Sequence, residues 1–258
     1  MRAGRVPGGK IIITGTGRSG TTLLMQMLTR LDMFTGVRSG QVSRVDWRTR
    51  GGLEWWYIDD PQAPRVIKDP TLSTRLGDLL ADGKLEIDHV IIPIRKLDIA
   101  AASRVRASRY GRNIFVRGGL FGTWRATKQR EALAIMLYEL MYALAEHEIP
   151  HTLLEFPRFA TDYEYTFRAL WFLCPTKSRI DFRQALEGAA HTDLIHEEPL
   201  SRKERLLTRY NTLRYGLTLR RQQRVANEPV ADRSADDVAS GGATREPAAD
   251  EHERPTDT

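Results

Sequence analysis

The sequence is poor in cysteine. Cys174 is the only cysteine among 258 residues, so the chain can form neither an internal disulfide nor a zinc site built from several thiolates. The fold must therefore be stabilised by its apolar core, and the composition suits a reducing compartment. We expect a cytoplasmic protein.

Long hydrophobic runs and metal-ligand patterns are also missing. No stretch approaches the roughly 18 to 20 uninterrupted apolar residues of a membrane span, and residues 1–10 lack the apolar segment of a secretory signal. The six histidines show no HxH or HExxH spacing, so we predict no metal site. His89 and His151 open predicted strands and are interpreted as structural. We expect no integral membrane segment.

Acidic residues are concentrated in residues 226–258, which hold nine Asp and Glu against three Arg and no aromatic residue. Such a segment cannot bury enough apolar surface to fold. We therefore predict an α/β domain over residues 1–225 and a disordered acidic tail over 226–258. The whole chain carries +6 and the tail −6, which leaves the domain at +12 and indicates an anionic partner or substrate.

Short β-rich runs alternate with longer helical patterns along the domain. The predicted strands are residues 10–14, 65–68, 89–94 and 151–156. The predicted helices are residues 20–31, 71–80, 99–108, 128–146 and 162–174. Continuous apolar runs are typical of strands covered on both faces, and strand–helix alternation favours parallel pairing. The sequence predicts an α/β fold of three layers, with a central parallel sheet flanked by helices.

Two segments fit this alternation less well. Residues 38–60 form a long excursion in which Trp55, Trp56 and Tyr57 either bind an acceptor such as a sugar ring or anchor the segment to the core. The sequence after Pro199 is a basic helix or helix pair. It is either a solvated charged face over a narrow apolar seam or a surface facing an anion or a membrane.

A glycine-rich loop, residues 15–22 (GTGRSGTT), joins the first predicted strand to the first predicted helix. In this arrangement backbone N–H groups and the helix dipole converge on phosphate, glycines allow a close approach, and Arg18 adds a charged donor. Thr21 stands where the Walker loop GxxxxGK carries the lysine that binds nucleoside triphosphates. We therefore predict a P-loop-like fold whose ligand has no γ-phosphate and little need for a metal.

A second anion clamp is predicted after the strand of residues 89–94. Arg95 follows that strand directly, and Ser103 comes eight residues later on a helix for which Asp98 is the expected cap. The carboxyl edge of an open parallel sheet faces the ligand crevice. Arg95 and Ser103 are therefore predicted to grip a phosphate together, apart from the glycine loop.

The two patterns together resemble the sulfotransferases that use 3′-phosphoadenosine 5′-phosphosulfate (PAPS), in which the loop holds the 5′-phosphosulfate and the Arg–Ser pair holds the 3′-phosphate. The resemblance covers residues 10 to about 159 and is closest to the bacterial branch with a Lys-Asp-Pro after the second strand, here residues 68–70. Arginine replaces the usual lysine of the loop. The donor-binding residues it implies are Gly17, Arg18, Ser19, Gly20, Thr21, Thr22, Leu23, Arg95 and Ser103.

This sequence departs from the family pattern at three places. Leu23 replaces the tryptophan that stacks on adenine, and no histidine occupies the place of the catalytic base. The late basic loop is matched only poorly, by residues 182–184.

The resemblance implies transfer of a sulfuryl group from PAPS, without a metal, to a hydroxyl or amine of an acceptor such as a carbohydrate. Charge develops on the bridging oxygen during such a transfer, and Arg18 is the first choice to meet it, with Lys68 second. Asp69 is the leading candidate for the general base and Glu54 the reserve. Asp69 also suits a turn, because it precedes Pro70.

Two other classes remain open from the sequence. One is a P-loop kinase of nucleotides or small molecules, and the other is a non-catalytic module that binds polyanions. The basic residues are scattered, with no dense run interleaved with stacking aromatics, so we expect no nucleic-acid partner. No motif specifies the acceptor or the oligomeric state.

Overall fold

The computed structural model describes residues 8–37, 53–55, 58, 60, 62–83, 85–113, 118–189 and 198–227. Most of the predicted excursion and all of the predicted tail beyond residue 227 lie outside these ranges. The chain divides into two units, residues 1–216 and 217–258. The sheet and the candidate site belong to the first unit, and the second holds the last turns of helix α8.

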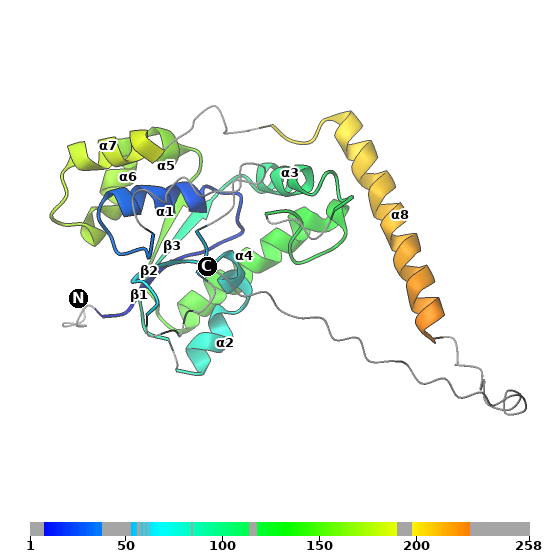
Figure 1. Cartoon of the computed structure of the whole chain (residues 1–258), viewed down its shortest axis with the longest axis horizontal. Helices are drawn as coiled ribbons and strands as arrows, with labels where there is room; N and C mark the ends of the chain where they lie inside the picture. Colours follow the sequence, from blue (N-terminus) through cyan, green and yellow to red (C-terminus); the bar gives the residue numbers. More distant parts are fainter. Residues whose placement is uncertain are drawn as a thin grey trace, which may run out of the picture. The chain divides into compact units, whose positions relative to one another are not determined.

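A parallel sheet lies at the centre of the first unit (Figure 1). Its strands are β1 (Lys10–Ile13), β2 (Val66–Lys68), β3 (Ile87–Ile94) and β4 (His151–Glu155), in the order β2-β1-β3-β4. Every neighbouring pair is parallel, and Ile12 of β1 lies between Ile67 and Val90. All four predicted strands are confirmed, with ends that differ by at most two residues.

Helices follow the strands in the predicted alternation. The α-helices are α1 (Thr21–Arg30), α2 (Leu76–Ala81), α3 (Leu97–Ala107), α4 (Gln129–Glu146), α5 (Arg158–Thr161), α6 (Tyr163–Leu170), α7 (Arg179–Ala189) and α8 (Arg202–Asn227). The 3-10 turns are η2 (Pro70–Thr74), η3 (Ala126–Lys128) and η4 (Trp171–Leu173).

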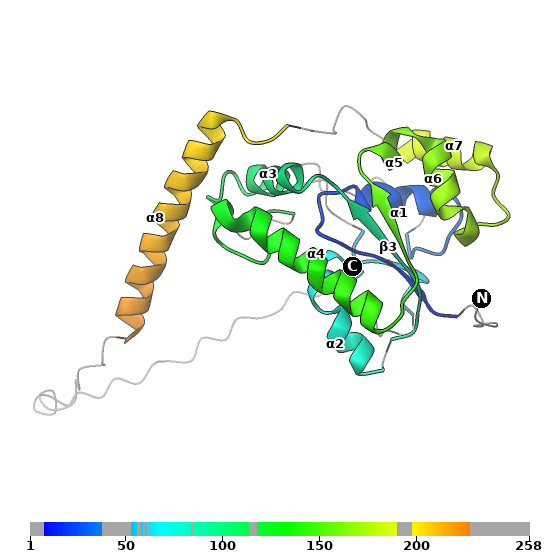
Figure 2. The same cartoon turned by 180° about the vertical axis from the view of Figure 1, so that it is seen from behind.

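Both faces of the sheet are covered, because successive strand residues point to opposite sides. Ile11 and Ile13 join a buried cluster with α1, α5, α6 and α7, whereas Ile12 joins a second cluster with α2 and α4. Figures 1 and 2 show these two groups of helices on either side of the strands. The fold is therefore a three-layer α/β fold, as predicted.

Some helices differ from the sequence prediction. The predicted helix 71–80 is split into η2 and α2 at Arg75, because the Asp69 carboxylate caps a 3-10 turn first. Within the predicted helix 162–174, α6 ends at Leu170 and the 3-10 turn η4 follows it. Helix α7 was not predicted. Its buried residues are Phe182, Ala185, Leu186 and Ala189, and the alanines among them give only a weak apolar signal.

The basic segment after Pro199 forms one helix, α8, rather than a pair. In the first unit, Glu204 of α8 accepts hydrogen bonds from Arg106 Nε at 2.9 Å and from the Tyr110 hydroxyl at 3.2 Å. The bond from Arg106 is the main reason that the pKa of Glu204 is lowered to about 2. α8 extends to Asn227, two residues into the predicted tail. Among the described residues, no helix combines the length and apolarity needed to cross a membrane.

Candidate functional site

The loop between β1 and α1 has an irregular backbone. The φ angles of Gly15, Gly17, Arg18 and Gly20 are 135°, 66°, 56° and 86°. Residues other than glycine rarely adopt such positive φ angles. Gly20 is the N-cap of α1, which has no side-chain cap hydrogen bond. The N–H groups of a first helical turn have no partner within the helix, so this end of α1 suits an anion.

The glycines at positions 17 and 20 are needed for packing beneath the loop. A Cβ on Gly17 would collide with the guanidinium of Arg104, and one on Gly20 would lie 2.7 Å from the rings of Phe156 and Phe159. The sequence attributed these glycines to close approach of a phosphate. The structure supplies a different reason for them, because the nearest obstacles are the protein's own side chains.

Arg104 supports the glycine loop through hydrogen bonds to main-chain carbonyls, a role that the sequence did not predict. It is only 4% exposed, and it donates hydrogen bonds from Nε to the Thr16 carbonyl at 3.0 Å and from Nη1 to the Gly119 carbonyl at 2.7 Å. Burial, and then repulsion by Arg18, lowers its pKa to about 10. It therefore stays charged at neutral pH. No sequence signal marks this role, because the carbonyls that Arg104 binds lie 88 and 15 residues away.

The two predicted anion clamps meet in the structure. Arg18 Nε donates to Ser103 Oγ at 3.0 Å, and Arg95 Nη1 donates to the Arg18 carbonyl at 3.1 Å. Arg95 follows β3 directly, as predicted, and its guanidinium lies 5.0 Å from the Phe156 ring centroid. Ser103 is in the second turn of α3 and is largely buried. Residues from both motifs thus lie together at the N-terminal end of α1.

The predicted role of Asp98 as a helix cap is wrong. Helix α3 begins at Leu97 with Lys96 as its N-cap, so Asp98 already lies inside the first turn. There its carboxylate forms an exposed ion pair with Arg130 at 2.8 Å. An acidic residue in the first turn still suits the helix dipole, which is why the sequence pattern resembled a cap.

Lys68 places a buried ammonium beside the loop. It is 1% exposed, donates to Thr22 Oγ1 at 2.7 Å, and pairs with Glu54 Oε1 at 2.9 Å. The backbone N–H of Trp55 donates to the Lys68 carbonyl at 3.1 Å, which aligns residues 53–55 with the end of β2. Lys68 therefore links the glycine loop to Glu54.

Asp69 shapes the turn after β2. Its Oδ1 accepts hydrogen bonds from the Thr71 N–H and the Thr71 hydroxyl, both at 2.7 Å, and thereby caps η2. The side chain is buried. The structural role that the sequence allowed for Asp69 is therefore present in the fold.

Two buried hydroxyls at the loop have no hydrogen-bond partner among the described residues, those of Thr14 and Ser19. Both residues are fully buried. Buried polar groups are nearly always hydrogen-bonded, and a hydroxyl in this position is able to bond to an oxygen of an anion. Thr21 is also buried in the first turn of α1.

The aromatic and aliphatic candidates lie against the core. Leu23 packs on the cluster under α1, so its side chain helps to stabilise the helix. Trp55 packs on the cluster of the opposite face, which agrees with the anchoring interpretation. Trp56 and Tyr57 lie outside the described residues.

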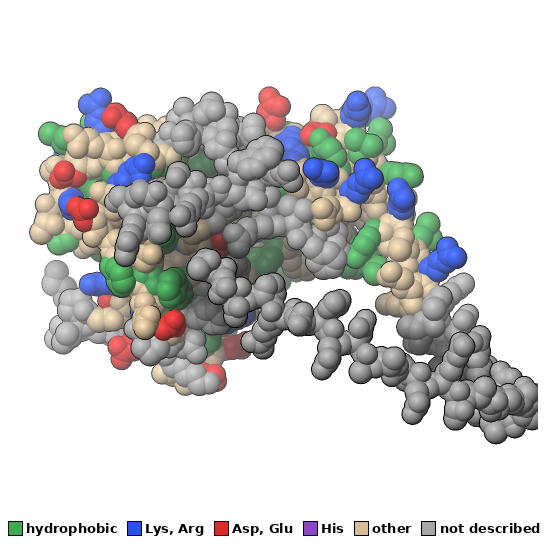
Figure 3. Space-filling view, in the orientation of Figure 1, with side chains coloured by type: hydrophobic (Ala, Val, Ile, Leu, Met, Phe, Trp, Pro, Cys, Tyr) green, Lys and Arg blue, Asp and Glu red, His purple; other side chains and the backbone are tan. Residues whose placement is uncertain are grey.

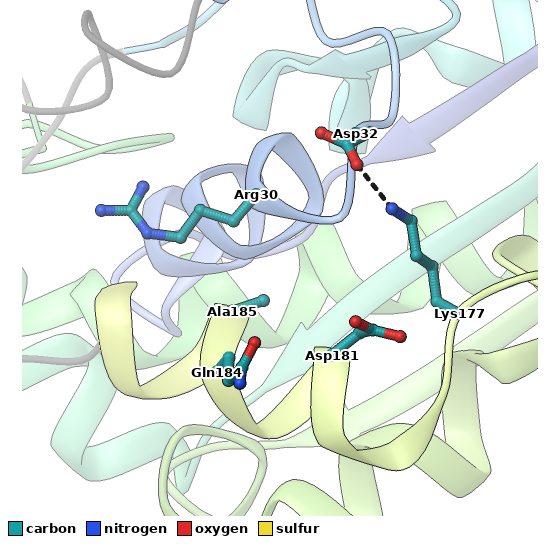
Figure 4. Close-up of a pocket in the computed structure, with 6 residues that line it drawn as sticks. All are labelled: Arg30, Asp32, Lys177, Asp181, Gln184 and Ala185. Carbon is teal, nitrogen blue, oxygen red and sulfur yellow. Dashed lines mark hydrogen bonds and ion pairs between the residues drawn. The ribbon is translucent and has the colours of Figure 1, made fainter.

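A polar cavity of about 260 Å³ lies at the other end of α1 (Figure 4). It is lined by Arg30, Asp32, Lys177, Asp181, Gln184 and Ala185. Lys177 pairs with Asp32, just beyond the C-terminal end of α1, and not with the loop. Since Gln184 lies here and Phe182 is core, residues 182–184 do not complete an anion site at the glycine loop.

The histidines at the strand starts have structural partners. His89 Nε2 lies 2.8 Å from Thr152 Oγ1, and His151 Nδ1 lies 3.1 Å from the Ile149 carbonyl. Within the described ranges, no group of three or more His, Cys, Asp or Glu side chains is arranged to hold a metal ion.

The fold and the loop define a three-layer α/β protein. A scan against models of known protein families finds no match to this chain, and a search of curated proteins finds none either. The geometry of the chain's own residues therefore carries the functional argument.

Proposed function

We propose that the protein is a sulfotransferase that takes its sulfuryl group from PAPS. One observation carries this proposal: Arg18 of the glycine loop contacts both Ser103 and Arg95 of the second motif, at 3.0 and 3.1 Å. A ligand with an anion at each end of a ribose needs two clamps within one nucleotide's length. Here the clamps are neighbours at the carboxyl edge of the sheet.

The residues at the loop fit such a donor chemically. Arg18, Lys68 and Arg95 supply cations, and the start of α1 supplies the positive end of a helix dipole. The buried hydroxyl of Ser19, which has no partner among the described residues, supplies a donor for a phosphate or sulfate oxygen. Each charge-assisted hydrogen bond contributes about 1.5 to 3 kcal/mol, so a few of them hold a dianion firmly.

When bound, PAPS supplies a sulfuryl group on a phosphate leaving group. Arg18 binds the oxygens at the 5′ end, and its charge stabilises the negative charge that builds up when the sulfur–oxygen bond breaks. Lys68 fixes the Thr22 hydroxyl at 2.7 Å and adds a second positive charge. Arg95 and Ser103 orient the donor through its 3′-phosphate. Positioning of this kind accounts for much of the rate in group transfer.

A general base must accept the proton of the acceptor hydroxyl or amine. Glu54 and Asp69 both remain candidates, and the geometry favours Glu54. Its Oε1 accepts a hydrogen bond from Lys68 Nζ at 2.9 Å, and Lys68 also contacts the loop. Glu54 is thereby tied to the loop, whereas Asp69 Oδ1 binds Thr71 in the turn after β2. The Lys68 ammonium keeps a carboxylate in place near the reacting atoms.

A kinase is the second candidate, because Lys68 brings an ammonium to the loop from β2. Its contact with Thr22 places a charge close to where the Walker lysine would act in a nucleoside triphosphatase. This alternative requires ATP with Mg²⁺ rather than a nucleotide carrying a 3′-phosphate.

Thermal unfolding with two ligands separates these functions. Adenosine 3′,5′-bisphosphate at 100 times its dissociation constant should stabilise the full chain by about 2.7 kcal/mol. ATP with Mg²⁺ should stabilise it far less. Stabilisation by ATP and Mg²⁺ alone would instead favour the kinase, and no response to either ligand would reject both.

The 3′-phosphate clamp can be tested by calorimetric titration. Arg95→Ala and Ser103→Ala should each weaken the binding of adenosine 3′,5′-bisphosphate by about tenfold or more. The binding of adenosine 5′-phosphosulfate, which has no 3′-phosphate, should weaken by clearly less, through the contacts of both residues with Arg18. Lys96→Ala is the matched control, because Lys96 is the exposed neighbour of Arg95. Equal losses for both ligands would remove Arg95 and Ser103 from this role.

The base can be assigned with carboxamide variants. Glu54→Gln should abolish turnover while preserving donor binding, and Asp69→Asn should lower stability through η2 while leaving most of the turnover per folded molecule. Turnover is measured as the conversion of PAPS to adenosine 3′,5′-bisphosphate with a panel of hydroxyl and amine acceptors. The reverse pattern would return the role to Asp69.

A further inference from the structure

The outward face of α8 carries a stripe of large apolar side chains. Leu206, Tyr210 and Leu213 are 59%, 60% and 71% exposed. Their spacing of four and then three residues puts them on one side of the helix. Figure 3 shows hydrophobic and basic side chains side by side along this helix. We call Leu206, Tyr210 and Leu213 the outer stripe.

The opposite side of α8 fixes this orientation. Glu204 is bound by Arg106 and Tyr110, Thr208 is 3% exposed, and Asn211 Nδ2 donates to the Tyr110 carbonyl at 3.2 Å. Residues 204, 208 and 211 are again four and three apart, but half a turn away from the outer stripe. The helix therefore cannot roll over to bury its leucines against the domain without breaking these contacts.

Basic residues border the outer stripe. Residues 202–216 contain five Lys and Arg and a single acid, Glu204, which is turned inward to Arg106. Arg202, Lys203, Arg205 and Arg209 are all exposed. Helical spacing puts Arg202 and Arg209 on one edge of the stripe and Lys203 on the other. The apolar side chains thus lie between Arg202 and Arg209 on one edge and Lys203 on the other.

We propose that α8 docks on the surface of a lipid bilayer that contains anionic headgroups. Leucine and tyrosine side chains would enter the headgroup boundary while the flanking cations meet lipid phosphates and carboxylates. The same charges argue against a second copy of this chain as the occupant, because two α8 helices packed through their outer stripes would bring like charges together. The inference does not depend on the proposed sulfotransferase activity.

Vesicle flotation of the full chain tests this proposal. The protein should bind phosphatidylcholine vesicles containing about 30% phosphatidylserine, bind pure phosphatidylcholine far less, and detach at high salt. Leu206→Gln with Leu213→Gln should weaken binding to the anionic vesicles by about tenfold or more. Arg205→Gln with Arg209→Gln should weaken it by about thirtyfold, since each cation near such a surface contributes on the order of 1 kcal/mol.

Matched controls lie on another helix. Ile180 is 65% exposed on α7, and Arg179 beside it is also exposed, so Ile180→Gln and Arg179→Gln should bind anionic vesicles as the unchanged protein does. Circular dichroism checks that each variant keeps its helices.

Three results would overturn the proposal. The first is equal binding to neutral and anionic vesicles. The second is unchanged binding by both α8 variants. The third is that the protein fails to bind vesicles and instead forms a dimer, detected by light scattering, which is lost in the variant with Leu206→Gln and Leu213→Gln. That last result would assign the outer stripe to a second copy of the chain.

Discussion

The charged groups at the amino and carboxyl edges of the central sheet, where the parallel strands begin and end, differ in their contacts. At the amino edge several charged or titratable groups have a close partner: Arg65 pairs with Asp88 at 3.3 Å, Lys10 Nζ donates to the Ala63 carbonyl at 2.6 Å, and His89 contacts Thr152 at 2.8 Å. At the carboxyl edge four cations gather, Arg18, Lys68, Arg95 and Arg104, and the ion pair described there joins Lys68 to Glu54.

This difference indicates what each edge is for. The contacts at the amino edge join residues of the fold to one another and stabilise it. At the carboxyl edge, burial and then repulsion by Arg18 lower the pKa of Arg104, and an anion bound beside these cations would reduce that repulsion. The gathering of cations at the carboxyl edge thus suits an anionic ligand. Four predictions test this contrast, from the largest effect to the smallest.

Removing the buried ammonium at the carboxyl edge should have the largest effect. Lys68→Met leaves the Glu54 carboxylate buried without its cation and should cost about 3 to 5 kcal/mol of unfolding free energy in urea. Lys68→Met with Glu54→Leu should recover much of that loss. At the amino edge, Arg65→Met removes a partly exposed pair and should cost less than about 1 kcal/mol. Similar losses at both edges would contradict the contrast.

Arg104→Lys should cost about 2 to 3 kcal/mol in the same urea measurement, although it keeps the charge. A lysine cannot reach the Thr16 and Gly119 carbonyls together as the guanidinium does. Binding of adenosine 3′,5′-bisphosphate should weaken as well, because the loop loses its support. Arg130→Lys, at an exposed ion pair, is the control. Full stability in Arg104→Lys would mean that charge alone matters at this position.

His89 should make the amino edge sensitive to acid. Burial, and then repulsion by His151, lowers its pKa from 6.5 to about 4. The unfolded chain therefore takes up a proton first as pH falls from 6.5 towards 4, and the folded state is destabilised over that window. Because the ring is partly exposed, we expect about 1 kcal/mol. Urea unfolding of His89→Gln between pH 7 and 4.5 should show a shallower decline than the unchanged protein, and an equal decline would assign the acid sensitivity to other groups.

Ser19→Ala should barely change stability, by about 0.5 kcal/mol or less, because the Ser19 hydroxyl has no partner among the described residues to lose. The affinity for adenosine 3′,5′-bisphosphate, measured by calorimetry, should fall by about fivefold to tenfold. A clear loss of stability without ligand would show that the hydroxyl serves the fold instead.

Sequence reasoning worked where the physics is local. The strands were predictable because apolar runs such as residues 89–94 are buried on both faces. The closeness of Arg95 and Ser103 to the glycine loop follows from a helix that begins three residues after the end of β3, which fixes where its second turn lies.

Other features depend on contacts between distant parts of the chain. Arg104 binds a carbonyl 88 residues away, and no spacing rule marks such a contact. The pairing of Lys68 with Glu54 needs residues 53–55 to run beside β2, which Trp55 secures through its N–H. The position of residues 182–184 depends on how α7 packs against α1.

The packing of Gly17 on Arg104 ties together two positions that are far apart in the sequence. A side chain at position 17 would need the space that the guanidinium fills, and a shorter residue at position 104 would release the carbonyls of Thr16 and Gly119. A substitution at either position alone should therefore destabilise the loop. In descendants of this chain, the two should be inherited together or replaced together.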